Sequence, residues 1–166
     1  MPRDPIETLL DNLRETHDVY RRLLTVAEKK KTHILQNDIE GIRADIQAEE
    51  TLSRKGAGLN AACDDLRREC SRSMGDGDDV PTLETLGSLL PTERREPFEE
   101  ERRALKGTLR ELRDRNRTNM VLVNNSLGLM EGLLAAMFGT ETVSTYGRRG
   151  NRTRGGMPVR ALNAKA

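Results

Sequence analysis

The sequence predicts an all-α fold: an elongated antiparallel helical hairpin, a long third helix bundled with it in coiled-coil fashion, one short helix and a disordered basic tail. Two observations lead to this prediction. Charged residues make up 33% of the chain and aromatic residues only 2%, which suits helices with a narrow apolar seam better than a strand-rich core. Apolar residues also recur at alternating spacings of three and four over long stretches, as in helices that pack side by side.

The first helix is expected to run from residue 5 to residue 36. Asp4 is placed to cap it, and Pro5 is favoured at a first helical position. His17 lies on the apolar face, where we expect it to pack rather than to bind a ligand. One heptad position of this helix is occupied by Ile6, Leu13, Tyr20, Ala27 and Ile34.

A turn at residues 36–38 is expected to reverse the chain, with Asp38 capping a second helix. A connection this short joins two long amphipathic helices as an antiparallel hairpin. Cys63 and Cys70 share the apolar face of the second helix about 10 Å apart, too far to pair with each other. Both are expected to be buried packing residues, since no second Cys/His pair has the spacing of zinc ligands.

Residues 71–81 are rich in Gly, Ser and Asp and are expected to form a linker. A short helix at residues 83–90, between a capping Thr82 and Pro91, is expected to fold over the hairpin. The last and longest helix is expected from about residue 93 to residue 138. Its apolar seam contains Phe98, Leu105, Leu109, Leu112, Asn116, Asn119, Met120, Val123, Leu127, Met130, Leu134 and Met137.

The chain is expected to divide into a helical domain, residues 1–139, and a flexible basic tail, residues 140–166. The tail holds six Lys and Arg against one Glu, whereas residues 1–139 hold 22 against 26 Asp and Glu. Arginines in a flexible segment resemble a nucleic-acid-binding arm. However, only Tyr146 offers an aromatic ring near them, and the helical domain is acidic. No nucleic-acid partner is therefore expected.

The sequence offers no catalytic, cofactor-binding or metal-binding residues, so we expect no enzymatic activity. It lacks a Walker-type phosphate loop and a Gly-rich fingerprint between a strand and a helix. Gly75–Asp79 resembles a calcium loop in composition alone, because Pro81 and Gly87 stand where such a loop needs glycine and a bidentate Glu. No leader sequence is evident, and polar residues interrupt the apolar stretch Met120–Phe138. We therefore expect a cytoplasmic protein that is not inserted in a membrane.

Two features of the last helix point to a binding function. Asn116 and Asn119 lie at or beside the seam, where a buried Asn can fix the register of neighbouring helices at a cost in stability. Beyond them, apolar residues exceed what one seam can bury, so that either a partner or the short helix at residues 83–90 must cover them. These residues are Leu127, Leu129, Met130, Leu133, Leu134, Ala135, Ala136, Met137 and Phe138.

Several short motifs also follow one another in a characteristic order. The Leu-rich first helix comes first, then the turn at Asn37-Asp38, the pair Glu49-Glu50 and the sequence Leu89-Leu90-Pro91. The last helix carries Asn116-x-x-Asn119-x-x-Leu122-x-x-x-Ser126-Leu127, and Thr145-Tyr146-Gly147-x-x-Gly150 follows it. Together these motifs resemble the FlgN type of flagellar export chaperone over residues 6–150.

The resemblance implies a non-enzymatic chaperone that binds hook-associated proteins, the subunits of the hook–filament junction, and delivers them to the cytoplasmic domain of the flagellar export gate. It also implies that the Asn-containing motif of the last helix binds the exported subunit and that Tyr146 takes part in docking at the gate. With the apolar excess, the expected partner-binding residues are Asn116, Asn119, Leu122, Leu129, Met130, Leu133, Ala136, Met137 and Tyr146.

One alternative from a different functional class stays open at this point. A structural coiled-coil oligomer whose basic tail binds nucleic acid or an anionic surface would share the same helical pattern and the same charge distribution. The sequence does not fix the oligomeric state, nor does it say which hook-associated protein would be bound.

Overall fold

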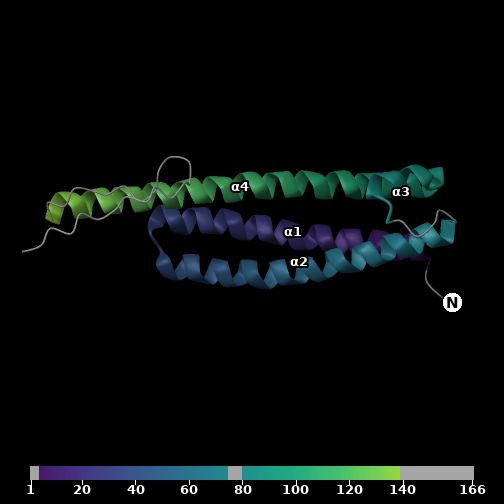
Figure 1. Ribbon diagram of the computed structural model, residues 1–166, viewed down its shortest axis with the longest axis horizontal. Coiled ribbons are helices and arrows are strands. Elements are labelled where there is room, and N and C mark those ends of the chain that lie inside the picture. Colours follow the sequence, from purple (N-terminus) through teal and green to yellow (C-terminus); the bar gives the residue numbers. More distant parts are fainter. Residues whose placement is uncertain (1–3, 75–79, 139–166) are drawn as a thin grey trace, which may run out of the picture. The chain divides into compact units, whose positions relative to one another are not determined.

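The computed structural model describes residues 4–74 and 80–138. These residues form the helices α1 (Pro5–Gln36), α2 (Ile39–Met74), α3 (Leu83–Leu89) and α4 (Thr92–Phe138), shown in Figure 1. Neither described range contains a strand, so the predicted all-α class is confirmed. Residues 1–125 and 126–166 form two compact units. The predicted flexible tail, residues 140–166, lies outside the described residues.

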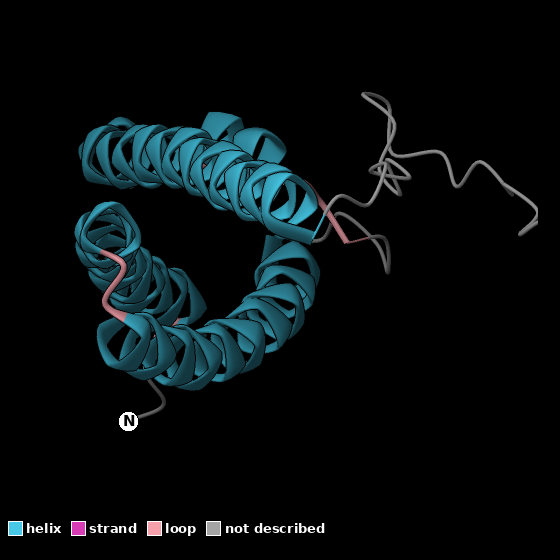
Figure 2. Cartoon of the chain, turned by 90° about the vertical axis from the view of Figure 1, so that its left-hand side faces the viewer, coloured by secondary structure: helices cyan, strands magenta, loops and turns pink. Residues whose placement is uncertain are grey.

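The ends of α1 and the start of α2 lie where the sequence predicts them. The Asp4 carboxylate accepts a hydrogen bond from the Ile6 amide at 3.0 Å and caps α1. Asn37 follows α1 in the left-handed conformation (φ 54°), which Asn adopts more readily than most residues. The Asp38 carboxylate then accepts a hydrogen bond from the Gly41 amide at 3.0 Å. A short loop thus closes the predicted hairpin, as the end-on view in Figure 2 shows.

Two polar pairs join α1 to α2 near this turn. Lys30 Nζ lies 2.5 Å from a carboxylate oxygen of Glu49, and both side chains are mostly buried. His33 Nδ1 lies 2.7 Å from an oxygen of Asp45, whose residue is only 7% exposed. Buried charged groups of this kind need partners in good geometry. The pairs therefore fix the register of the hairpin as well as its closure.

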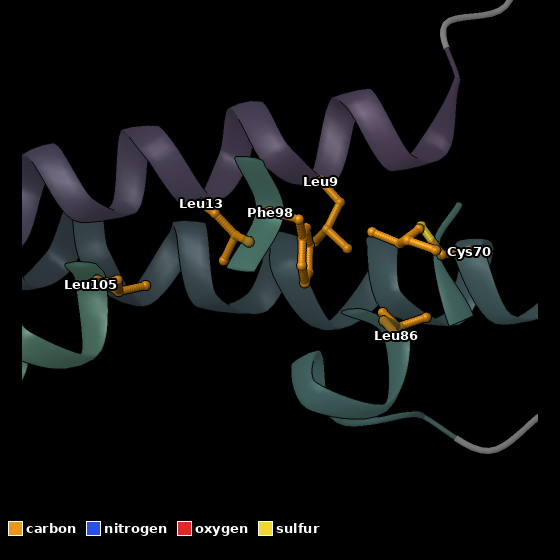
Figure 3. Packing of buried hydrophobic residues seen from close by; sticks show 7 residues of the cluster. Leu9, Leu13, Cys70, Leu86, Phe98 and Leu105 are labelled. Carbon is orange, nitrogen blue, oxygen red and sulfur yellow. The ribbon is translucent and has the colours of Figure 1, made fainter. Parts of the chain in front are cut away.

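A hydrophobic core brings all the described helices together (Figure 3). Phe98 is 1% exposed and supplies the largest buried side chain. The short helix α3 packs in this core beside the start of α4, so the alternative in which it covers the far end of α4 is wrong. The buried members of the core are Leu9 and Leu13 of α1, Cys70 of α2, Leu86 of α3, Leu90, and Phe98 and Leu105 of α4.

Helix α4 buries a single row of side chains: Phe98, Leu105, Leu112 and Asn119, each seven residues after the last. This spacing is typical of a helix that packs alongside others. The sequence also predicts Leu109 on the seam, but Leu109 is 39% exposed. It lies about 50° round the helix from the buried row, at about 100° per residue. That expectation is wrong because α4 packs through one row of positions rather than two.

Helix α2 is longer than the sequence predicts. The predicted linker starts at residue 71, whereas α2 continues to Met74. Cys70 and Ser71 are 1% and 2% exposed, so this part of the helix is held by packing. Ser73 Oγ donates to the Cys70 carbonyl at 2.8 Å and so needs no partner outside the helix. The polar composition of residues 71–81 predicts a linker and gives no sign that the first of them are packed in a helix.

Candidate functional site

Asn119 joins α4 to α1 at the end of the buried row. Its Nδ2 donates a hydrogen bond to the Ala27 carbonyl oxygen at 2.8 Å, and the residue is 4% exposed. Its Oδ1 is buried and has no hydrogen-bond partner among the described residues. One helical turn away, Arg115 pairs with Glu28 at 2.6 Å. Asn119 therefore fixes the register of α1 and α4, as a buried Asn on a seam is expected to do, and half of its amide is unsatisfied.

His17 makes a second polar connection between these two helices. Its Nδ1 lies 2.6 Å from an oxygen of Glu101, and its Nε2 lies 3.0 Å from the Thr108 hydroxyl oxygen. A neutral imidazole with its proton on Nδ1 satisfies both contacts, donating to the carboxylate and accepting from the hydroxyl. His17 thus packs inside the bundle, as the sequence predicts, and also links α1 to α4.

A groove of about 690 Å³ opens beside Asn119, between α1, α2 and α4. All three helices contribute side chains to its lining. Among the described residues that line it, only Lys30 and Glu49 are charged, and they neutralise each other. The other lining residues are Tyr20, Leu23, Ile34, Ile42, Ile46, Ser53, Leu112, Asn116, Asn119, Met120, Val123 and Asn124.

The structure brings only part of the predicted binding set together. Asn116 lines the groove with an exposed side chain, and Asn119 lies buried at its base. Leu122 is half-buried. Tyr146 lies outside the described residues. The remaining predicted residues belong to the other compact unit, on the last turns of α4: Leu129, Met130, Leu133, Ala136 and Met137.

Sequence reasoning missed the walls that α1 and α2 contribute to the groove. Ile42 and Ile46 lie on the apolar stripe of α2, and such a stripe usually packs against a neighbouring helix. Ile46 is instead 44% exposed and faces the groove. The sequence carries no signal for this exposure, because Ile39, Ile42 and Ile46 form a single stripe that one partner helix could cover.

The last turns of α4 form an exposed apolar surface, here called the apolar end (residues 126–138). Its large side chains fall on about half of the helix circumference at about 100° per residue, and Glu131 and small residues occupy the other half. Leu129 and Met137 are 71% and 76% exposed. The large side chains are Leu127, Leu129, Met130, Leu133, Leu134, Met137 and Phe138.

Within α4, an 18-residue stretch is apolar enough to cross a membrane by length and composition, and none of it is buried. Those two properties do not distinguish a membrane span from a protein-binding surface. The expectation of a protein that is not inserted in a membrane therefore stays a prediction.

The two cysteines sit in the bundle without a metal-binding partner set. Burial raises the pKa of the Cys70 thiol to about 11, and it also raises the pKa of the Cys63 thiol. A protonated thiol is a poor nucleophile and a poor metal ligand. No group of three His, Cys, Asp or Glu side chains that could hold a metal ion occurs in residues 4–74 or 80–138.

Comparison with known proteins decides between the functional classes. The family model described as FlgN protein matches residues 1–154, which is almost the whole chain. The chain belongs to the FlgN family. It is accordingly a flagellar export chaperone in general terms, and the predicted family resemblance is confirmed. The match includes the Asn-containing part of α4 and extends past Tyr146. No curated protein and no solved structure matches the chain.

Proposed function

We propose that this FlgN-family protein is a cytoplasmic, non-enzymatic chaperone that binds hook-associated flagellar proteins and hands them to the cytoplasmic domain of the export gate. The exposed apolar end of α4 carries the proposal. It presents seven large apolar side chains on one face of one helix. A surface of this size on a water-soluble protein marks a site where another molecule is buried.

The chemistry of the apolar end fits a helical segment of a partner. Burying a large aliphatic side chain is worth about 1.5–3 kcal/mol, so a few of these residues supply enough free energy for a stable complex. Met130 and Met137 add adaptable side chains, which suit a surface that must accept more than one sequence. No nucleotide or metal is needed for binding or release by such a surface.

The groove beside Asn119 extends the same proposal to the first compact unit. Its lining is apolar with uncharged amides, and its one charged pair is internally neutral. A partner helix with apolar and uncharged polar side chains would enter it without burying an unpaired charge. Asn116 is exposed in this groove and is placed to exchange hydrogen bonds with such a helix.

Purified hook-associated proteins test the cargo assignment directly. Wild-type protein and the Leu133→Glu variant are compared in pull-down and calorimetry, with Leu35→Glu as the matched control because Leu35 is also exposed (61%) but lies at the end of α1. We expect Leu133→Glu to lose binding while its unfolding temperature stays near wild type, and Leu35→Glu to keep binding. Equal binding by all three proteins would place the cargo site elsewhere.

The gate assignment needs a separate measurement. We expect Tyr146→Ala to bind the hook-associated protein normally and to lose binding to the isolated cytoplasmic domain of the export gate. Tyr20→Phe is the control for loss of a tyrosine hydroxyl, which in the wild type accepts from Asn60 Nδ2 at 3.3 Å. Normal gate binding by Tyr146→Ala would remove Tyr146 from the docking site.

A further inference from the structure

A row of basic residues follows the outward face of α4. Arg103, Lys106, Arg110, Arg113 and Arg117 are all exposed and lie three or four residues apart. At about 100° and 1.5 Å per residue they fall within about 80° of the circumference and extend along about 21 Å of helix. Their centre lies about 130° from the buried row. This set is called the basic stripe.

The basic stripe lacks the ion pairs that are common elsewhere on these helices. Lys106, Arg110, Arg113 and Arg117 form no ion pair with any residue of the described ranges, and Arg103 donates only to the Glu99 carbonyl, at 3.1 Å. Seven arginines elsewhere pair with an acidic residue three or four positions earlier: Arg14, Arg22, Arg43, Arg67, Arg68, Arg102 and Arg115.

The arrangement has an electrostatic cost in the free protein. Each member of the stripe has another cation three or four residues away, and like charges at these spacings destabilise a helix. Asp114 lies beside Arg110 and Arg117 in the sequence pattern but pairs with neither. An acidic partner would remove this repulsion and would supply the missing ion pairs.

The geometry favours a short acidic helix of a protein over nucleic acid. The stripe is a single row on one helix, whereas polyanions are bound by wider basic surfaces, often with stacking aromatic rings. The described ranges hold three Tyr and Phe residues, Tyr20, Phe98 and Phe138, and none of them lies on the stripe. Residues 1–139 carry net negative charge, which repels a long polyanion more than it repels a short segment.

We propose that the basic stripe of α4 is a docking surface for an acidic protein segment, a helix with Glu or Asp repeated at three- and four-residue spacing. Such a helix can set its carboxylates opposite successive members of the stripe. The stripe lies on a different face of α4 from the buried row, so docking leaves the bundle intact. This proposal is independent of which protein fills the apolar end.

The probe for the test is a labelled alanine-based helical peptide with Glu at three- and four-residue spacing. Binding is followed by fluorescence anisotropy at low and at physiological salt. The double variant Arg110→Glu/Arg113→Glu is compared with Arg21→Glu/Arg54→Glu on α1 and α2, whose arginines are exposed and form no ion pair with any residue that the structure describes. Both double variants change the net charge equally and both keep the basic residues after Phe138, so only the position of the charge differs.

We expect the stripe variant to bind the acidic peptide about tenfold more weakly than wild type and the control variant to bind within about twofold. A peptide with Gln in place of Glu should not bind. The milder variant Arg110→Ala/Arg113→Ala, expected to weaken binding by a smaller factor, covers the case in which charge reversal disturbs folding. Equal loss in the stripe and control variants overturns the proposal, and so does tighter, stripe-dependent binding of a random DNA duplex or of anionic vesicles.

Discussion

Asn119 provides the sharpest test of how α4 is held. Replacing it with Leu removes the hydrogen bond to the Ala27 carbonyl, worth about 0.5–1.5 kcal/mol. The same change removes a buried acceptor, Oδ1, that has no hydrogen-bond partner among residues 4–74 and 80–138; leaving such an acceptor unpaired costs about 1–3 kcal/mol. The Ala27 carbonyl keeps its bond within α1, because a helical carbonyl accepts from the amide four residues later. Asn119→Leu should therefore be as stable as wild type or more stable by about 1 kcal/mol.

Asn119→Asp gives the opposite result at the same position. A carboxylate beside the Ala27 carbonyl oxygen has no donor and is buried, which should cost about 3 kcal/mol or more at neutral pH. Burial raises the pKa of such a carboxyl in the folded state above its unfolded value of about 3.9. The loss of stability relative to wild type should therefore be small below about pH 3.9, where the protonated carboxyl can donate a hydrogen bond to the Ala27 carbonyl. The loss should grow as pH rises through the folded-state pKa of the carboxyl.

Urea unfolding followed by circular dichroism measures both variants. The midpoint and the slope are both needed, because a change in slope alone would indicate an altered unfolded state. A loss of more than about 2 kcal/mol in Asn119→Leu would refute the reasoning, since it would mean that both ends of the amide are satisfied in the folded protein.

The buried row, the thiols and the N-cap lead to further predictions. Leu112→Ala should cost about 2–4 kcal/mol in urea unfolding, whereas Leu109→Ala should cost under about 1 kcal/mol because Leu109 is partly exposed. Cys70 should react with a thiol reagent more slowly than Cys63 in the folded protein, at a rate that keeps rising with pH toward its pKa of about 11. Asp4 has a pKa lowered mainly by the Ile6 amide and then by Arg94. The ionised Asp4 carboxylate should therefore add to the free energy of unfolding at any pH above the ordinary carboxyl pKa, and this contribution should be lost as pH falls through the lowered pKa of the folded protein. The free energies of unfolding of wild type and Asp4→Asn should accordingly converge in acid.

The sequence allowed most of the fold to be predicted because its helix boundaries are marked by local chemistry. Asp4 and Asp38 cap helices by accepting hydrogen bonds from nearby amides, and Asn37 adopts the left-handed conformation that ends α1. These effects depend on residues within one turn of each other, so no knowledge of the tertiary structure is needed.

The candidate site could be predicted only in part, because it depends on which helices meet. Asn119 was identifiable as a polar residue on a seam, but its partner is a backbone carbonyl 92 positions away in the sequence. The groove needs Ile46 and Met120 to remain uncovered, and an apolar stripe looks the same whether its neighbour is present or absent. The apolar end was predictable because no arrangement of one seam could bury so many large residues.

The pairing of α1 with α4 has a consequence for the order in which the chain acquires structure. The hairpin contacts nearest the turn, His33–Asp45 and Lys30–Glu49, join residues 12 and 19 positions apart, and Asn12–Leu59, further from the turn, spans 47. The contacts from His17 and Ala27 to α4 span 84 and 92 positions. Closing a long loop is entropically slower than closing a short one. We expect the hairpin to form while the ribosome is still making α4. Until α4 is complete, the apolar side chains of the hairpin that α4 later covers are exposed to solvent. A protein that shields others during export would thus itself pass through a stage in which its own apolar surface is unshielded.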